Sequence, residues 1–233
     1  TFWATLPIVL TAFIKIFGLI FCSFFFVYDN KKQFLIGILF WSLILFYAPA
    51  LFSSIDFLHQ SYKDWHYAVV VKAGIHYDIS FIRFLKSVLL FNVNKYYILI
   101  GGALMFCFTY LRYHQFHQPV FKQLFLSSIL IWMVIFSPSA ESPTYIIAVT
   151  GTVIWFINSE QKNWQKLLMV FVFIITIMSP SDLFPAFIRK NYVVPYALKA
   201  LPCAIVWLCT LYEMLFRNFD AQKGKNTALN TSK

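Results

Sequence analysis

Charged residues are scarce in this sequence, and acidic residues are the scarcest of them. Only 12% of the 233 residues are charged, whereas soluble domains carry about 25%. Hydrophobic residues make up 60% of the chain and include 28 phenylalanines. This balance indicates that much of the chain is surrounded by lipid rather than by water.

The small acidic content leaves a net charge of +10, because nine acidic residues face 19 lysines and arginines. A nucleic-acid-binding protein would gather such basic residues on one face. Here they stand singly between apolar runs, which is typical of the loops between membrane helices. We therefore expect no nucleic-acid partner.

The motifs of nucleotide-binding proteins, serine hydrolases and metal sites are missing. The sequence has no Gly-rich phosphate loop, no G-x-S-x-G and no C-x-x-C. Its four cysteines lie inside apolar runs and its five histidines are scattered. This pattern favours small buried side chains and surface histidines over a disulfide framework or a metal site. We expect no metal and no cofactor.

Long apolar runs dominate what is present. A transmembrane helix needs about 20 mainly apolar residues. Short polar breaks separate seven candidates, which are 4–28, 34–53, 96–113, 122–138, 143–158, 164–180 and 197–216. The sequence therefore predicts an all-α fold, a multispanning bundle of about seven transmembrane helices within residues 1–216. The polar tail at 217–233 is expected to be disordered.

Lysine and arginine predict the side of the membrane that each loop occupies, because cytoplasmic loops are enriched in both. The richer side includes Lys31, Lys32, Lys122 and the tail 217–233, which we therefore assign to the cytoplasm. Three polar segments then share the outer side, and they are the loop 54–95, the turn around 136–145 and the loop 179–196.

The outer loop 54–95 contains a predicted amphipathic helix. From Ser80 to Phe91, apolar residues recur at helical spacing and polar residues gather on the opposite side. Asp78 or Ser80 can cap the start of this helix. A helix of this kind lies in the membrane interface. There it either anchors the chain or grips the phosphate of a lipid headgroup, and both interpretations stay open.

The sequence FSPSAESPTY forms a polar turn between two apolar runs. Its candidate site residues are Ser137, Ser139, Glu141, Ser142 and Tyr145. A plain turn needs no acid, so Glu141 has two interpretations. It either caps the helix that begins near Pro143, or it binds the hydroxyl groups of a sugar or an acceptor on the outer face.

Four cations complete the candidate site. Lys15 and Lys199 fall inside apolar runs, where an ionisable side chain is a functional candidate unless it reaches the interface. Two prolines flank Lys199, so we expect a broken or kinked entry to the last helix. Together with Arg189 and Lys190, Lys199 either binds a phosphate or diphosphate or anchors the chain in an interfacial aromatic belt.

Three stretches carry a resemblance to a known family. The sequences SPSAESPTYIIAVTGTVIWF, AFIKIFGLIFCSFFFVYDNKKQF and FPAFIRKNYVVPYALKALPCAIVWL resemble the C-terminal half of bacterial glycosyltransferase family eighty-seven. These enzymes are polyprenol-phosphate-mannose-dependent mannosyltransferases and their relatives with the GT-C fold. The match runs in order over most of the chain, and its motifs are loose.

The resemblance implies a multi-pass enzyme of the bacterial plasma membrane. It would transfer a sugar, with mannose expected, from a polyprenyl-phosphate donor to a lipid-linked or glycan acceptor on the outer face, surrounded by membrane lipids. The family's catalytic Asp lies in the first outer loop and has no counterpart here. Since the chain begins at Thr1 without a basic leader, we expect that Asp to precede it in a longer protein. A transporter or a non-catalytic membrane protein is the alternative.

Overall fold

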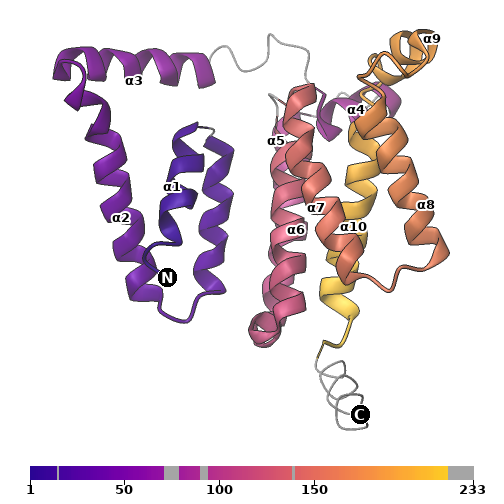
Figure 1. The fold of residues 1–233 in the computed structure, drawn as a ribbon, viewed down its shortest axis with the longest axis horizontal. Coiled ribbons are helices and arrows are strands. Elements are labelled where there is room, and N and C mark those ends of the chain that lie inside the picture. Colours follow the sequence, from indigo (N-terminus) through magenta and orange to yellow (C-terminus); the bar gives the residue numbers. More distant parts are fainter. Residues whose placement is uncertain (15, 71–78, 90–93, 138–139, 220–233) are drawn as a thin grey trace. The chain divides into compact units, whose positions relative to one another are not determined.

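The computed structural model describes residues 1–14, 16–70, 79–89, 94–137 and 140–219 (Figure 1). The chain divides into two compact units, Thr1–Tyr77 and Asp78–Lys233. Within the described ranges the regular structure is helical and contains no β-strand, which confirms the all-α prediction. The boundary between the units falls inside the long polar segment 54–95.

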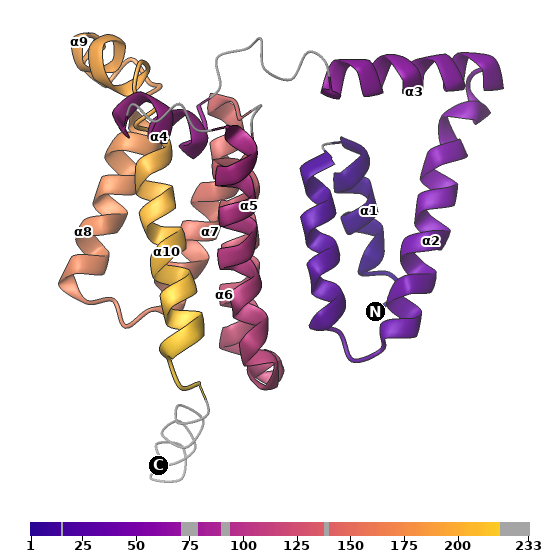
Figure 2. The same ribbon diagram turned by 180° about the vertical axis from the view of Figure 1, so that it is seen from behind.

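The first unit contains a helical pair followed by two further helices. Its elements are α1 (Thr5–Ile14), η1 (Ile16–Phe26), α2 (Lys31–Tyr47), η2 (Ala48–Leu51) and α3 (Ile55–Val70). The α1 and η1 helices run antiparallel to each other (Figure 1, Figure 2). The prediction of a single span over 4–28 is therefore wrong. Gly18 permits the reversal, because a Cβ atom there would lie 2.5 Å from the backbone of Thr11.

One helix of the described residues is long and apolar enough to cross a membrane. It is the continuous stretch Lys31–Leu51, formed by α2 and η2, which has 21 residues. Only 11% of its most apolar part is buried, so its hydrophobic side chains face outward. Asn30 caps its start, since the Asn30 side chain accepts a hydrogen bond from the backbone of Gln33. This helix matches the predicted span 34–53.

The segment after α2 is helical, which the sequence did not predict. In α3, Tyr62 stacks on Phe46 with 4.5 Å between the ring centroids. The Tyr62 hydroxyl donates to the Phe46 carbonyl at 2.8 Å. These contacts tie α3 to the end of α2.

The second unit contains the remaining helices. They are α4 (Phe81–Leu89), α5 (Lys95–Cys107), η3 (Phe108–His117), α6 (Pro119–Ile135), η4 (Ser142–Thr144), α7 (Tyr145–Asn158), α8 (Asn163–Phe171), η5 (Val172–Met178), α9 (Ala186–Ile188), η6 (Arg189–Val193) and α10 (Ala200–Phe216). The five predicted spans after residue 95 all fall on helices here. Whether these helices cross a membrane stays a prediction. The apolar helices Pro119–Ile135, Ser142–Asn158, Asn163–Met178 and Ala200–Phe216 are each 10–17 residues long, whereas a transmembrane helix needs about 20.

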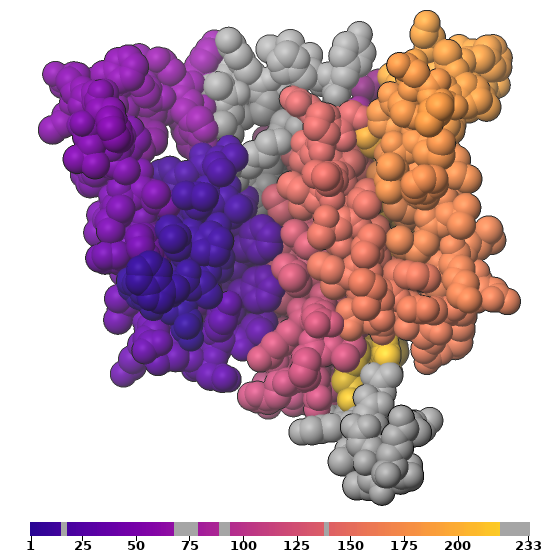
Figure 3. Space-filling model, viewed as in Figure 1, coloured from indigo at the N-terminus to yellow at the C-terminus, as the bar shows by residue number. Residues whose placement is uncertain are grey.

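The core of the second unit lies between α6, α7 and α10. On α6, Leu124, Ile131 and Ile135 are fully buried, and Trp155 of α7 is equally covered. Trp207 of α10 donates a hydrogen bond from Nε1 to the Ser128 hydroxyl of α6 at 3.0 Å. Side chains of α7 and α8 cover most of α10 on one face (Figure 3).

The predicted amphipathic helix corresponds to α4, which lies across one end of the helices of the second unit (Figure 1, Figure 2). The Ser80 hydroxyl accepts a hydrogen bond from the backbone of Arg83 at 3.3 Å. Ser80 therefore caps the start of α4, and it is one of the two capping residues that the sequence predicts. The other candidate, Asp78, and tail residues 220–233 lie outside the described residues.

The most extensive helix packing among the described residues of the second unit is between α6 and α7. The Ser127 hydroxyl donates to the Gly151 carbonyl at 2.7 Å. A Cβ atom on Gly151 would lie 2.7 Å from Ile131 Cγ1 and 2.9 Å from the Ser127 carbonyl oxygen. Small residues permit this approach, as they do in membrane helix pairs.

We expect Gly151→Ala to lower the free energy of unfolding by about 1–3 kcal/mol, because the added methyl group meets backbone that cannot yield. Thermal unfolding of the purified protein measures this effect. The matched control is Gly101→Ala on α5, where no atom lies within 4 Å of the new Cβ. That substitution should stabilise the helix by about 0.5–1 kcal/mol. Equal effects of the two substitutions would contradict the proposed packing.

Candidate functional site

The turn between α6 and α7 is joined to the start of α4 at one end of the second unit. The backbone N–H of Ile79 donates to the Ala140 carbonyl at 3.1 Å. The buried Tyr145 hydroxyl donates to the Ile79 carbonyl. Two of the predicted outer polar segments therefore meet directly. The sequence did not indicate that the connection would run through the backbone of Ile79.

Lys199, directly before α10, reaches the same end of the second unit from the predicted span 197–216. Its ammonium nitrogen donates to the Ser142 carbonyl at 3.0 Å and to the Ser142 hydroxyl at 2.5 Å. It also lies 5.0 Å from the centre of the Tyr145 ring, within the range of a cation–π interaction. Only 4% of Lys199 is exposed. The Lys199 ammonium group therefore faces protein groups among the described residues.

The backbone around Lys199 is also fixed by tertiary contacts. The Thr176 hydroxyl of η5 donates to the Lys199 carbonyl at 3.0 Å. Two residues earlier, Ala197 is fully buried and has a φ of 50°, a conformation that costs an L-residue about 1–2 kcal/mol. This turn separates η6 from α10, so the broken entry expected from the flanking prolines is present. It directs the Lys199 side chain toward Ser142.

Glu141 does not cap a helix through its carboxylate. It stands before η4, and its backbone carbonyl accepts from Thr144 at 3.1 Å, but its side chain makes no capping hydrogen bond. The side chain is exposed, and no ion pair joins it to another described residue. The capping interpretation of the acid is therefore wrong. Ser137, in the same turn, is buried.

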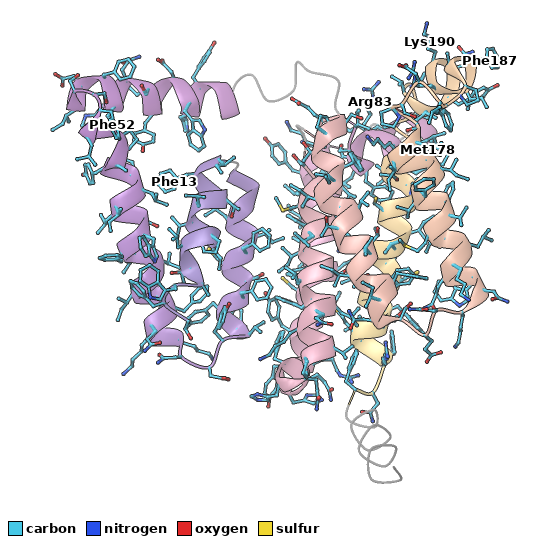
Figure 4. All side chains as sticks on the ribbon, in the orientation of Figure 1. Phe13, Phe52, Arg83, Met178, Phe187 and Lys190 are labelled. Atoms are coloured by element: carbon cyan, nitrogen blue, oxygen red, sulfur yellow. The ribbon has the colours of Figure 1, made fainter. Side chains whose placement is uncertain are left out.

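The other two described cations do not join Lys199 in one cluster. Arg189 donates from Nη1 to the carbonyls of Pro180 and Ser181 at 3.3 and 3.2 Å. Its nearest carboxylate, Asp182, is 3.8 Å away and fully exposed. Lys190 is exposed and projects from the far side of the α9–η6 segment (Figure 4). The compact set at this end is thus Lys199, Ser142 and Tyr145.

Two predicted site residues, Lys15 and Ser139, lie outside the described residues. Among the residues that the structure describes, no group of three or more His, Cys, Asp or Glu side chains could hold a metal ion. The site has one buried cation, hydroxyl groups and an exposed acid. This set can bind an anion and hydrogen-bond to the hydroxyl groups of a substrate.

A second charged cluster, at the opposite end of α10, was not predicted from the sequence. Glu213 lies inside the predicted span 197–216, and its Oε2 accepts from Arg217 Nη1 at 3.2 Å. The available signal was an acid inside an apolar run with a basic residue four positions later, which is the spacing of neighbours on one helix face.

Comparison with known proteins gives no relative for this arrangement. No protein-family model, no curated protein and no solved structure matches the chain.

The contact between Lys199 and Ser142 can be tested by stability. We expect Ser142→Ala to lower the free energy of unfolding by about 1–2 kcal/mol, because a buried cation loses one of its hydrogen-bond acceptors. The matched control is Ser181→Ala, whose hydroxyl bonds only the carbonyl of Met178 three residues earlier. Thermal unfolding of both variants compares them, and an equal loss would refute the role of Ser142.

Proposed function

We propose that this chain is part of a multi-pass glycosyltransferase of the bacterial plasma membrane. It takes a sugar, with mannose expected, from a polyprenyl-phosphate donor and passes it to a lipid-linked or glycan acceptor on the outer face. The resemblance of three stretches to glycosyltransferase family eighty-seven supports this proposal. So do the membrane-length helix Lys31–Leu51 and the low content of charge.

The observation that carries the proposal is the burial of Lys199 without a carboxylate partner among the described residues. A buried charge is costly unless it is compensated. An ammonium group has three donors, and Ser142 accepts two hydrogen bonds from it. In this proposal the remaining donor bonds a phosphate oxygen of the donor lipid, which supplies the missing negative charge.

Glu141 supports the acceptor side of the same proposal. Its carboxylate is exposed one residue before Ser142, which holds Lys199. An exposed carboxylate next to a phosphate-binding cation is suited to accept hydrogen bonds from sugar or acceptor hydroxyl groups. It does this without contributing to the fold.

We expect Glu141→Gln to lower sugar transfer by at least about tenfold, equivalent to about 1.4 kcal/mol of transition-state stabilisation. The thermal stability should stay unchanged, because the carboxylate has no partner in the described fold. The assay measures sugar transfer from a polyprenyl-phosphate donor in membranes that contain the full-length protein.

The control for this substitution is Asp29→Asn, which removes an exposed acid before α2 on the predicted cytoplasmic side and should leave transfer unchanged. If Glu141→Gln transfers sugar at the wild-type rate, the acid does not bind substrate. If wild-type membranes transfer no sugar, the enzyme proposal fails, and the transporter or the non-catalytic membrane protein takes its place.

The predicted orientation of α2 can be tested separately. In a variant without the four native cysteines, Ser53→Cys should react with a membrane-impermeant maleimide added outside intact cells. Lys32→Cys should react only after the membrane is opened, because it lies at the other end of the 21-residue stretch. The reverse pattern would overturn the assignment of the loop 54–95 to the outer side.

A further inference from the structure

A pocket of about 660 Å³ lies in the second unit between α8 and α10. It is at the end of α10 opposite to Lys199, where the two helices diverge (Figure 1, Figure 2). Its lining includes Glu160, Lys162, Glu213 and Arg217, with Trp164 and Tyr212 beside them. Four of these are charged, with two of each sign.

The inner wall of the pocket is a fixed polar network around Glu213. Its Oε1 accepts from Trp155 Nε1 at 3.1 Å and from Gln165 Nε2 at 3.4 Å. Its Oε2 accepts from Arg217 Nη1 at 3.2 Å, and the same guanidinium nitrogen donates to the Asn158 carbonyl at 2.7 Å. Both side chains of the ion pair are less than one-fifth exposed. These charges are already compensated and hold α7, α8 and α10 together.

The outer wall carries a second ion pair, which is exposed to solvent. Lys162 Nζ lies 2.6 Å from Glu160 Oε2, and the two side chains are 62% and 60% exposed. The hydrogen bond and charge of Lys162 lower the pKa of Glu160, and Glu160 raises the pKa of Lys162, so both groups are charged at neutral pH. Exposed ion pairs contribute little to stability. A ligand with both charges can therefore replace each partner with little loss.

Aromatic side chains form the rim of this pocket. Trp164, Tyr212 and Phe216 are at least half exposed, although large aromatic groups are normally covered. Tyr212 and Phe216 pack together with 4.9 Å between their ring centroids. Exposed aromatic residues beside charges, at the end of apolar helices, are typical of the interface between hydrocarbon and lipid headgroups.

We propose that this pocket binds the headgroup of a zwitterionic phospholipid that carries a phosphate and a primary ammonium group. The phosphate contacts Lys162, and the ammonium contacts Glu160 and the aromatic rim. The acyl chains follow the exposed apolar side chains of Leu167 and Leu208. The balance of two cations and two carboxylates favours this lipid over an anionic one. The inference rests on the membrane placement proposed above and is independent of sugar transfer.

The test is native mass spectrometry of the full-length protein after incubation with equal amounts of phosphatidylethanolamine and phosphatidylglycerol. We expect the wild-type protein to retain at least about five times more phosphatidylethanolamine. Glu160→Gln should abolish this preference, because the ammonium group loses its carboxylate. Lys162→Gln should weaken binding of both lipids, because both carry a phosphate. These two side chains are exposed, so neither substitution should disturb folding.

The matched control is Lys166→Gln, which removes an exposed cation of α8 that does not line the pocket. It should leave lipid retention unchanged. Equal retention of both lipids by the wild-type protein, or an equal loss with all three variants, would overturn the headgroup assignment. Extraction of the protein from membranes by alkaline carbonate would overturn the membrane placement and this proposal together. Retention in the membrane with no lipid preference would overturn the headgroup assignment alone.

Discussion

The second unit depends on the close approach of α6 and α7. Gly151 lets the two backbones come together, and the Ser127 hydroxyl bonds the Gly151 carbonyl across the contact. This packing fixes the positions of the turn residues that follow α6. Ser142 and Tyr145 can then reach Lys199 and the carbonyl of Ile79. The polar end of the unit is therefore a consequence of an apolar contact along the helices.

Backbone carbonyl groups take the place of carboxylates as partners of the cations. The chain has nine acidic residues for 19 basic ones, so most cations need another acceptor. Arg112 donates to the carbonyls of Leu215 and Arg217 at the end of α10, and Arg217 donates to the carbonyl of Asn158 at the end of α7. The last carbonyls of a helix have no partner within it and attract cations. One set of interactions thus satisfies helix ends and basic side chains together.

The sequence predicts much of this fold because the relevant signals are local. Apolar runs separated by polar breaks mark the helices after residue 95, and the serine before Phe81 marks the start of α4. The separation of α1 from η1 is not predictable in this way, because both lie in one long apolar run. The reversal there depends on the approach of Gly18 to Thr11, which is a tertiary contact. The α3 helix has too mixed a composition to produce a clear signal.

The sequence predicted the residues of the candidate site better than the contacts between them. The alternation of loops predicts that three polar segments share one side, and the structure joins two of them, 54–95 and 136–145, through Ile79. Lys199 of the predicted last span meets the same turn. The partner of Lys199 could not be predicted, because it is the carbonyl and hydroxyl of Ser142, neither of which carries a charge that a sequence pattern reveals. A phosphate-binding cluster of three cations was also expected, but Arg189 is held by its local carbonyls and Lys190 points away.

The pairing of Lys199 with Ser142 has a consequence for the order of assembly. The two residues are 57 positions apart, so the ribosome completes the acceptor well before it makes the lysine. The α6–α7 contacts lie within residues 119–158, which are synthesised before α10. When α10 follows, its charged start meets a carbonyl and a hydroxyl group that are already in place. Biogenesis of the last helix should therefore depend on the earlier hairpin, rather than on the hydrophobicity of α10 alone.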